Sequence, residues 1–272
     1  MKKAQLPWLR LLLHIPIHVQ LPFGSRWIAE NDSCGRAILR GDFEIAETRF
    51  VEQYLQPGMT VLDIGAHHGY YSLLASASVG KSGKVVAFEP SVRERGKLRH
   101  HLELNHCENV TVEEFAVGAN DGRAEFFVVQ GIETGCNSLR PPIGAERTKK
   151  SDVAIKCLDA YTAEHGLSEI DFIKMDVEGG ELEVLRGAER LLERKPRPVI
   201  LCEVQDERTR AWSYAAIEII EKLQKLDFRW FRLPLEGSLR PLAGGKKTFD
   251  GNFVAVPEER LEQLQLSKVL AQ

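Results

Sequence analysis

The fold of this chain is decided by the stretch Val61-Leu62-Asp63-Ile64-Gly65-Ala66-His67-His68-Gly69-Tyr70-Tyr71. Its apolar start predicts a buried strand, and the apolar residues from Tyr71 onward recur at helical spacing. Between them, Gly65 and Gly69 let the backbone approach a ligand closely, and the start of the helix offers unpaired N–H groups. The stretch therefore predicts a cofactor site, although two glycines in this position also form tight turns that bind nothing.

A second signal follows in the next strand, Val85-Val86-Ala87-Phe88-Glu89, which ends in a carboxylate. Folds that bind dinucleotides place an acid roughly 20 residues after the glycine turn, where it binds the ribose hydroxyls. Glu89 follows the glycine turn at about that spacing. The two signals together favour a site for a nucleotide-containing cofactor.

Composition limits the classes of protein to which the chain can belong. Its 272 residues contain no Pro/Gly/Ser-rich linker, so one main domain is favoured. A net charge of -3 argues against non-specific binding of nucleic acid. The five cysteines include no close pair of the kind that binds zinc or works in redox chemistry. Reduced thiols, with Cys202 as a small buried residue, predict a cytoplasmic protein.

Residues 1–40 are expected to form an extension or cap, and residues 41–272 a single domain. The segment 1–23 starts with basic residues, and Arg10 and Pro16 interrupt its apolar run. That run is far short of the ~20 residues that span a bilayer, and no small-residue cleavage site follows it. We expect an amphipathic element that packs on the domain or covers its active site, without stable insertion into a membrane. Contact with a membrane surface is the less favoured alternative.

Strands and helices alternate through the rest of the chain. Helices are expected at 43–55, where one caps the cofactor loop, and at 91–104, 181–192 and 215–226. Further strands are expected at 110–112, 124–129, 170–175, 199–204, 228–233 and 252–256. The alternation predicts an α/β fold with a mainly parallel sheet and helices on both faces. Residues 131–151 are expected to form a mobile loop, whose basic run is interpreted as solvated rather than phosphate-binding.

Acids close three of the expected strands: Asp63, Glu89 and Asp176, the last followed by Glu178. In such a sheet, ligands bind beyond the carboxyl ends of the strands, near the point where strand order reverses. Alternation in an extended chain would turn Asp176 and Glu178 to the same side. Their repulsion would raise the pKa of one of them and suit a general base, whereas Lys174 or a divalent cation would hold both ionised. The sequence leaves these cases open, together with a simple helix-capping role for Asp176.

Two histidines lie inside the glycine turn. At least one of His67 and His68 is expected to contact the ligand, and a metal role is disfavoured because no third ligand is expected nearby. This completes a set of motifs: Val61-Leu62-Asp63-Ile64-Gly65-Ala66, Phe88-Glu89-Pro90, Phe115-Ala116-Val117-Gly118, Phe172-Ile173-Lys174-Met175-Asp176-Val177-Glu178-Gly179-Gly180-Glu181 and Asn252-Phe253.

The set resembles the FkbM-type family of class I S-adenosylmethionine-dependent methyltransferases over residues 43–257. Its most specific part is the Lys-x-Asp-x-Glu-Gly-x-Glu block at 174–181. The resemblance implies a Rossmann-like, seven-stranded sheet whose last strand is antiparallel. It also implies S-adenosylmethionine as cofactor and a hydroxyl oxygen as acceptor, often on a sugar or polyketide-like product. Nucleic acid is not an expected partner, a divalent cation is left open, and the oligomeric state is not indicated.

The resemblance also carries roles for single residues. The cofactor would be bound by Asp63, Gly65, Ala66, His67, Gly69, Glu89, Pro90, Ala116, Val117 and Asp176. At the position of His67 the family commonly has asparagine. Asp176 would lie beside the transferred methyl group as the candidate base, and Glu178 would position it or help to bind a cation. Lys174 completes the candidate catalytic group.

Other classes of protein are alternatives. An NAD(P)-dependent oxidoreductase is disfavoured because the turn departs from Gly-x-Gly-x-x-Gly and because hydride transfer gives no reason for the Asp176 and Glu178 block. A methyltransferase acting on RNA or protein is a second alternative. A non-catalytic binding module is the third, and the presence of Asp63, Gly65 and Glu89 argues against it.

Overall fold

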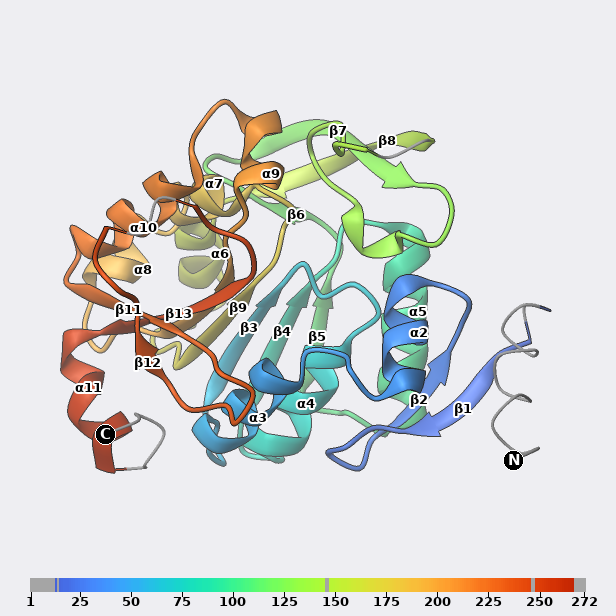
Figure 1. The fold of residues 1–272 in the computed structure, drawn as a ribbon, viewed down its shortest axis with the longest axis horizontal. Coiled ribbons are helices and arrows are strands. Elements are labelled where there is room, and N and C mark those ends of the chain that lie inside the picture. The colour runs from blue at the N-terminus through green and yellow to red at the C-terminus, as the bar shows by residue number, and fades with distance from the viewer. Residues whose placement is uncertain (1–12, 14, 145–146, 246–247, 267–272) are drawn as a thin grey trace.

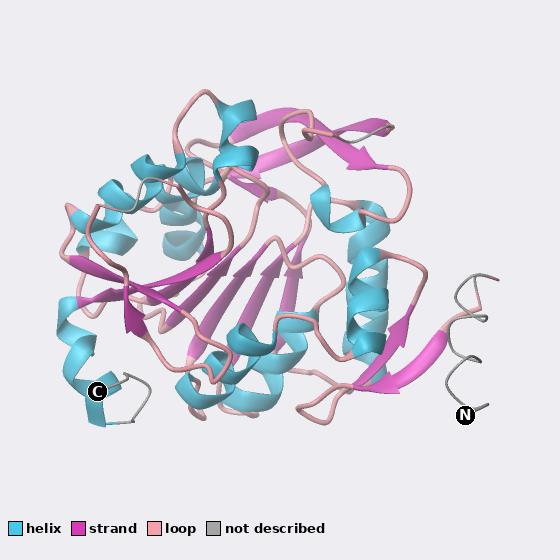
Figure 2. Ribbon diagram, in the orientation of Figure 1, coloured by secondary structure: helices cyan, strands magenta, loops and turns pink. Residues whose placement is uncertain are grey.

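A mainly parallel sheet lies between two layers of helices in the computed structural model, which describes residues 13, 15–144, 147–245 and 248–266 (Figures 1 and 2). The strands of this sheet, in spatial order, are β5 (Val110–Glu113), β4 (Lys84–Phe88), β3 (Thr60–Ile64), β9 (Phe172–Met175), β10 (Val199–Glu203), β13 (Asn252–Pro257), β11 (Phe228–Arg232) and β12 (Arg240–Pro241). The order reverses between β3 and β9, so ligands are expected at the carboxyl ends of these two strands.

The pairing of the strands confirms the expected architecture. Strands β5, β4, β3, β9 and β10 are parallel, whereas β13 is antiparallel to both β10 and β11. The last long strand is therefore antiparallel, as predicted. The strand count was one too low, because the two-residue strand β12 extends the edge of the sheet beyond β11.

Successive side chains of each central strand point to opposite faces of the sheet, where they pack into two separate apolar cores. In β3, Val61 belongs to one apolar core and Leu62 and Ile64 to the other. The first core is covered by α2 (Ser33–Arg40), α3 (Ile45–Tyr54), α4 (Tyr70–Val79) and α5 (Val92–Leu104). The second is covered by α6 (Leu158–Glu164), α7 (Glu181–Arg186), α8 (Glu189–Glu193) and α10 (Ala216–Gln224). Cys202 is fully buried in the second core, as predicted.

The single helix expected at 181–192 is two short helices, α7 and α8. The break is at Gly187, which lies against the chain beside β6. A Cβ atom on Gly187 would lie 2.1 Å from the carbonyl oxygen of Gly118. The helix ends where the two backbones meet, a long-range contact that helical periodicity does not encode.

The expected loop 131–151 is shorter than predicted because its end belongs to a strand. A separate sheet contains β6 (Ala116–Val117), β8 (Thr148–Lys156) and β7 (Gly122–Val129), in that order. Lys149 and Lys150 are exposed on β8, and Lys150 pairs with Glu125 at 3.0 Å. The basic run is therefore solvated, as interpreted. The remaining connection contains the short 3-10 helix η1 (Thr134–Cys136).

The described start of the chain contains a hairpin of β1 (Ile17–Gln20) and β2 (Arg26–Ala29). Trp27 is buried and stacks on His101 of α5, with 3.9 Å between ring centroids. Most of the amphipathic segment predicted at 1–23 lies outside the described residues. The remaining elements are α9 (Asp206–Thr209), η2 (Arg210–Trp212), η3 (Glu258–Arg260) and α11 (Leu261–Leu266). Among the described residues, no helix combines the length and apolar character that crossing a membrane requires.

Candidate functional site

The site lies where strand order reverses, with Gly65 directly after β3 and Asp176 directly after β9. The Asp176 N–H donates to the carbonyl of Ile64 at 3.0 Å, so the two chain segments continue side by side beyond the sheet. Gly65 has a φ of +82°, and a Cβ atom there would lie 1.9 Å from the carbonyl oxygen of Asp176. Only glycine fits this position without a shift of backbone.

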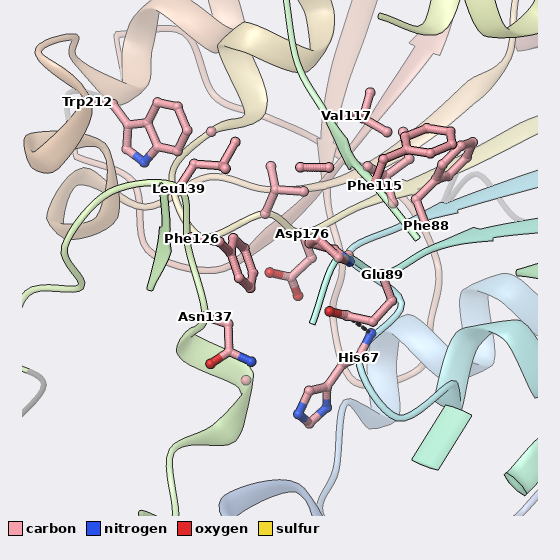
Figure 3. Close-up of a pocket in the computed structure, with 17 residues that line it drawn as sticks. His67, Phe88, Glu89, Phe115, Val117, Phe126, Asn137, Leu139, Asp176 and Trp212 are labelled. Atoms are coloured by element: carbon pink, nitrogen blue, oxygen red, sulfur yellow. Dashed lines mark hydrogen bonds between the residues drawn. The ribbon is translucent and has the colours of Figure 1, made fainter. Parts of the chain in front are cut away.

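A narrow slot opens beside Gly65 and Asp176, between the sheet and the loop that follows β7 (Figure 3). Seven residues predicted to bind the cofactor line it: Gly65, His67, Glu89, Pro90, Ala116, Val117 and Asp176. Its other walls are largely apolar and include Phe88, Phe115, Phe126, Leu139 and Trp212. An apolar slot with a carboxylate at one end suits a flat heterocycle joined to a ribose.

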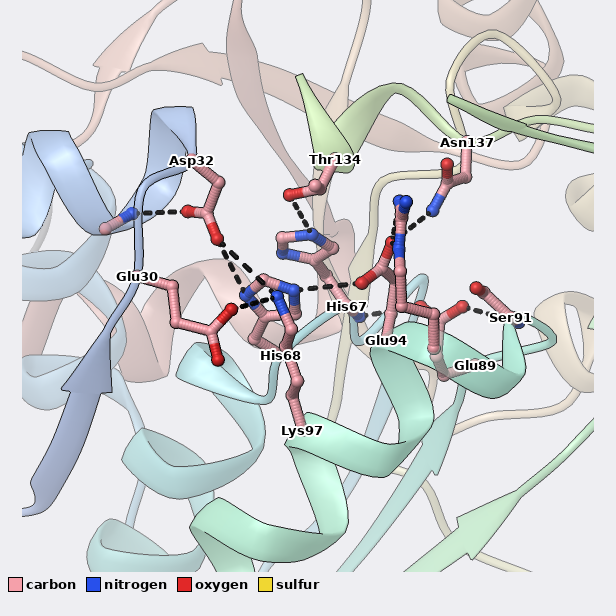
Figure 4. Close-up of polar contacts among 12 residues, drawn as sticks. Glu30, Asp32, His67, His68, Glu89, Ser91, Glu94, Lys97, Thr134 and Asn137 are labelled. Atoms are coloured by element: carbon pink, nitrogen blue, oxygen red, sulfur yellow. Dashed lines mark hydrogen bonds and ion pairs between the residues drawn. The ribbon is translucent and has the colours of Figure 1, made fainter. Parts of the chain in front are cut away.

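Glu89 is held at the slot by two backbone N–H groups (Figures 3 and 4). Its Oε2 accepts a hydrogen bond from the His67 N–H, and its Oε1 accepts one from the Ser91 N–H, each at 2.8 Å. The side chain is buried, and burial raises the pKa of Glu89 to about 8 against the lowering effect of these donors. The carboxylate is thereby fixed in position before any ligand binds.

A second cavity, of about 410 Å³, adjoins the slot and shares Gly65, His67, Gly135 and Asp176 with it. The predicted residues Asp63, Ala66, Lys174 and Glu178 line this cavity and not the slot. Its far wall comes from the start of the chain, with Trp27, Ser33, Cys34, Ala37, Arg40, Phe43 and Glu44. The predicted site residues therefore divide between two connected spaces that meet at Asp176.

Gly69 lines neither space. It precedes α4 with a φ of +89°, and a Cβ atom there would lie 2.4 Å from Cδ1 of Leu98. Its position is explained by the start of the helix and by close packing against α5. The prediction that Gly69 contacts the cofactor has no geometric support in the described structure.

Asp176 and Glu178 come together through a turn rather than through extended alternation. Glu178 has a φ of +57°, and its carboxylate lies within 4.8 Å of those of Asp176 and Glu203. Lys174 Nζ lies 3.2 Å from Asp176 Oδ2, and Arg208 Nε lies 2.8 Å from Glu178 Oε2. Each member of the predicted acid pair thus has its own side-chain cation.

The charges of this acid group are strongly coupled because they are shielded from water. Burial, with Asp176 adding to it, raises the pKa of Glu178 to about 8. Burial alone would lower the pKa of Lys174, but Asp176, Glu44 and Glu203 together raise it above its ordinary value. The capping alternative for Asp176 is wrong, because the N-cap residue of α7 is Gly180.

Asp63 faces the second cavity from the end of β3. Its Oδ2 accepts a hydrogen bond from the Ser72 hydroxyl of α4 at 2.5 Å. Burial raises the pKa of Asp63 to about 6, and this hydrogen bond opposes the rise. Asp63 therefore adds negative charge to a cavity that Glu44, Asp176, Glu178 and Glu203 already make acidic.

The two histidines of the glycine turn have different environments (Figure 4). The rings stack with centroids 3.6 Å apart, and His67 Nε2 lies 3.1 Å from the Thr134 hydroxyl. Buried His68 lies between Glu94, at 3.0 Å, and Asp32, at 3.9 Å. His68 therefore links the segment before α2 and helix α5 to the turn, whereas His67 lines both the slot and the second cavity. The expectation that no third ligand lies near the two histidines was wrong, because α5 brings Glu94 within 4.8 Å of both.

Sequence reasoning missed Glu44, Asp32, Glu94 and Trp212 as neighbours of the site. Each approaches from an element remote in sequence from the glycine turn or from the 174–181 block. An isolated carboxylate or indole carries no spacing signal, so only the fold identifies these residues.

This strand order, with the glycine turn and acids at the carboxyl ends of its strands, defines the class I fold of S-adenosylmethionine-dependent methyltransferases, whose cofactor is S-adenosylmethionine. Within this class the chain belongs to the FkbM methyltransferase family, whose domain matches residues 63–230.

Curated relatives match parts of the chain. It is 29% identical over 209 residues to the AMB antimetabolite synthetase AmbE of Pseudomonas aeruginosa, covering 64% of this chain and 10% of that protein. It is 28% identical over 106 residues to ribosomal RNA large subunit methyltransferase E of Alcanivorax borkumensis, covering 39% of this chain and 50% of that protein. The chain thus spans half or less of the length of these relatives.

Solved methyltransferases resemble the chain more distantly. An O-methyltransferase from Bacillus cereus in complex with SAH has a TM-score of 0.44 at 15% identity, covering 78% of this chain and 80% of that one. Precorrin-6y C5,15-methyltransferase from Geobacter metallireducens has a TM-score of 0.43 at 15% identity, covering 78% and 88%.

Proposed function

We propose that this protein transfers a methyl group from S-adenosylmethionine to a hydroxyl oxygen of a small molecule, such as a sugar or natural product. The observation that carries the proposal is the pair of connected spaces that meet at Asp176. One is a slot suited to an adenosine, and the other is a cavity large enough for an acceptor.

The lining of each space fits one part of the cofactor. Glu89 would accept hydrogen bonds from the ribose hydroxyls, while Pro90, Ala116 and Val117 would contact the adenosine. Asp63, Gly65 and Ala66 would surround the methionine part, with His67 at the junction. The acids of the second cavity match a ligand that carries an ammonium and a sulfonium, because buried carboxylates lacking enough cations favour positive charge.

S-adenosylmethionine supplies a methyl group on positively charged sulfur. The protein's contribution is orientation, from which about 7 to 11 kcal/mol of a barrier can come. Asp176 would contact the acceptor, as the predicted base or as the group that aligns its hydroxyl. Lys174 would fix the Asp176 carboxylate, and Glu178, paired with Arg208, would lie beside it.

The acidic lining of the second cavity also bears on the class of acceptor. Glu44, Asp63, Asp176, Glu178 and Glu203 outnumber the basic side chains that line it. Together with the net charge of -3, this disfavours the phosphate backbone of RNA as the group that enters. A neutral or positively charged small molecule is the better match.

The extent and location of the enzyme are further proposals. We propose residues 41–272 as the methyltransferase domain and residues 1–40 as an extension, of which the part from Trp27 to Arg40 contributes to the wall of the acceptor cavity. The five cysteines are free, which supports the proposed cytoplasmic location.

The acceptor class is tested with S-adenosylmethionine labelled in its methyl group. The purified protein is incubated with neutral sugars, amino sugars, polyketide-type alcohols, ribosomal RNA and a protein mixture, each with magnesium or with EDTA. Label is expected in an alcohol or sugar as an alkali-stable methyl ether. Label confined to RNA or protein would contradict the proposed acceptor, and loss of transfer in EDTA would show that a divalent cation is required.

A further inference from the structure

Glu44 lies outside the matched methyltransferase domain, yet it faces the cavity proposed for the acceptor. It immediately precedes α3 and lines the cavity together with Asp63, Lys174 and Asp176. It is half-buried, so its carboxylate is shielded from bulk water while remaining accessible from the cavity. A side chain in this position can touch a molecule bound there.

The backbone at Glu44 is held in a conformation that residues other than glycine rarely adopt. Its φ and ψ are 39° and 51°, in the left-handed region, where a residue with a side chain is strained. The side chain makes no capping hydrogen bond to α3, although Glu44 is its N-cap residue. The side chain therefore plays no part in capping the helix, and it lines the cavity instead.

Two neighbours define the state of the Glu44 carboxylate. The Tyr71 hydroxyl of α4 donates a hydrogen bond to Oε2. The other oxygen accepts no hydrogen bond from any residue that the structure describes. Burial raises the pKa of Glu44 to about 7, against the lowering effects of Lys174 and the Tyr71 hydroxyl. Near neutral pH the group can therefore both take up and release a proton.

Asp176, the other candidate, is already paired with a cation. Its Oδ2 lies 3.2 Å from Lys174 Nζ, and the Lys174 ammonium also lies 5.1 Å from the ring of Tyr71. The Lys174 ammonium is buried, so it depends on the Asp176 carboxylate as a partner. Asp176 is therefore suited to align the acceptor rather than to hold its proton.

We propose that Glu44 is the catalytic residue that receives the proton of the acceptor hydroxyl. The inference rests on the proposed methyl transfer to oxygen. The acceptor oxygen forms the new bond to the methyl carbon, and the electron pair of the carbon–sulfur bond returns to sulfur. The hydroxyl proton passes to the free oxygen of Glu44 and later leaves to solvent. The charge balances, because one positive charge on sulfur is replaced by one proton on the carboxylate.

The charge on sulfur favours the ionised form of Glu44 before transfer and the protonated form after it. The titratable groups that act on Glu44 or feel its charge come from four elements and the turn after β9: Cys34 of α2, Glu47 of α3, Tyr70 and Tyr71 of α4, Lys174 of β9 and Asp176. A sulfonium added to this set favours the ionised carboxylate, and its loss on transfer favours the protonated one. Glu44 is thereby ready to accept a proton before transfer and to retain it afterwards.

The test measures protons rather than turnover. S-adenosylmethionine and its demethylated product are titrated calorimetrically at pH 7 in buffers of different ionisation enthalpy, which gives the protons released on binding. The two ligands differ in the sulfonium charge, so their difference isolates its effect. If the sulfonium lowers the pKa of Glu44 from about 7 by at least one unit, Glu44 changes from half protonated to almost fully ionised at pH 7. Binding of S-adenosylmethionine then releases about 0.4 proton more than binding of its demethylated product. Glu44→Gln should remove this amount, and Glu52→Gln, exposed on the same helix, should not.

A second variant, Tyr71→Phe, tests the same prediction in case Glu44→Gln does not fold. Tyr71→Phe removes the hydroxyl that lowers the pKa of Glu44, so more Glu44 is protonated at pH 7 without cofactor. The pH at which S-adenosylmethionine binding releases most protons should then rise. An unchanged difference in Glu44→Gln, together with an unchanged pH of greatest release in Tyr71→Phe, would overturn the inference, whereas failure of wild-type protein to bind the cofactor would overturn the proposed function instead.

A kinetic measurement separates catalysis from structure. With an acceptor found by the labelling experiment, kcat should rise with pH as Glu44 ionises, and Asp176→Asn should keep this rise. Glu44→Gln should lower kcat by roughly 100-fold and remove the rise, with little change in KM for S-adenosylmethionine. A pH profile unchanged in Glu44→Gln would show that Glu44 does not receive the proton.

Discussion

Gly65→Ala is expected to lower the free energy of unfolding by about 3 kcal/mol or more and to abolish cofactor binding. The new Cβ atom would lie 1.9 Å from the Asp176 carbonyl oxygen, and the φ of +82° would strain any residue with a side chain. Because the contact is with backbone, relief requires β3 and β9 to move apart at their carboxyl ends. Urea unfolding and calorimetric titration with S-adenosylmethionine measure the two effects.

The matched control is Gly96→Ala, in the exposed part of α5. A Cβ atom there has no neighbour within 4 Å, so alanine should stabilise the helix by about 0.5 to 1 kcal/mol. Equal stability of Gly65→Ala and wild type, with normal cofactor binding, would show that the close approach of the two strand ends is not needed.

Asp176→Asn is expected to slow methyl transfer at least about 100-fold while the protein still binds S-adenosylmethionine. Asparagine has the same shape but cannot pair with the buried Lys174 ammonium, which now lies 3.2 Å from Oδ2. The acceptor therefore loses the charged group that aligns it where the slot and the cavity meet. Single-turnover transfer to an acceptor found by labelling measures the effect.

Asp250→Asn is the control for this change, because Asp250 is exposed and lines neither the slot nor the acceptor cavity. It should transfer at the wild-type rate. Full activity of Asp176→Asn with unchanged cofactor binding would remove Asp176 from the catalytic group.

The architecture was predictable because it depends on local patterns. Apolar runs of strand length and the glycine turn at Gly65 are visible in sequence, and the acid after each strand follows from where parallel strands end. The sequence offered two alternatives for Asp176, repulsion from Glu178 or pairing with Lys174 or a cation. The pairing with Lys174 could be foreseen because Lys174 and Asp176 lie two residues apart at the end of β9. Such short-range signals identified both the slot and the acid group.

The missed features depend on contacts between remote segments. Glu44 faces Asp176, and Asp32 approaches His68, only because α2 and α3 fold back over the carboxyl edge of the sheet. The break at Gly187 depends on the distant Gly118. The extended alternation predicted for Asp176 and Glu178 was wrong for a related reason. The backbone of Glu178 is left-handed, and its carbonyl accepts hydrogen bonds from the distant residues Ser138 and Trp212.

The most direct test of the account is a calorimetric titration of wild-type protein and Glu89→Ala with S-adenosylmethionine, its demethylated product and NADH. We expect micromolar binding of the first two ligands to wild type and none of NADH. The variant should bind about 10- to 150-fold more weakly, because the ribose hydroxyls lose their hydrogen bonds to the buried Glu89 carboxyl group. Binding of NADH in place of S-adenosylmethionine would contradict the account and favour an oxidoreductase, and binding of neither would favour a non-catalytic module.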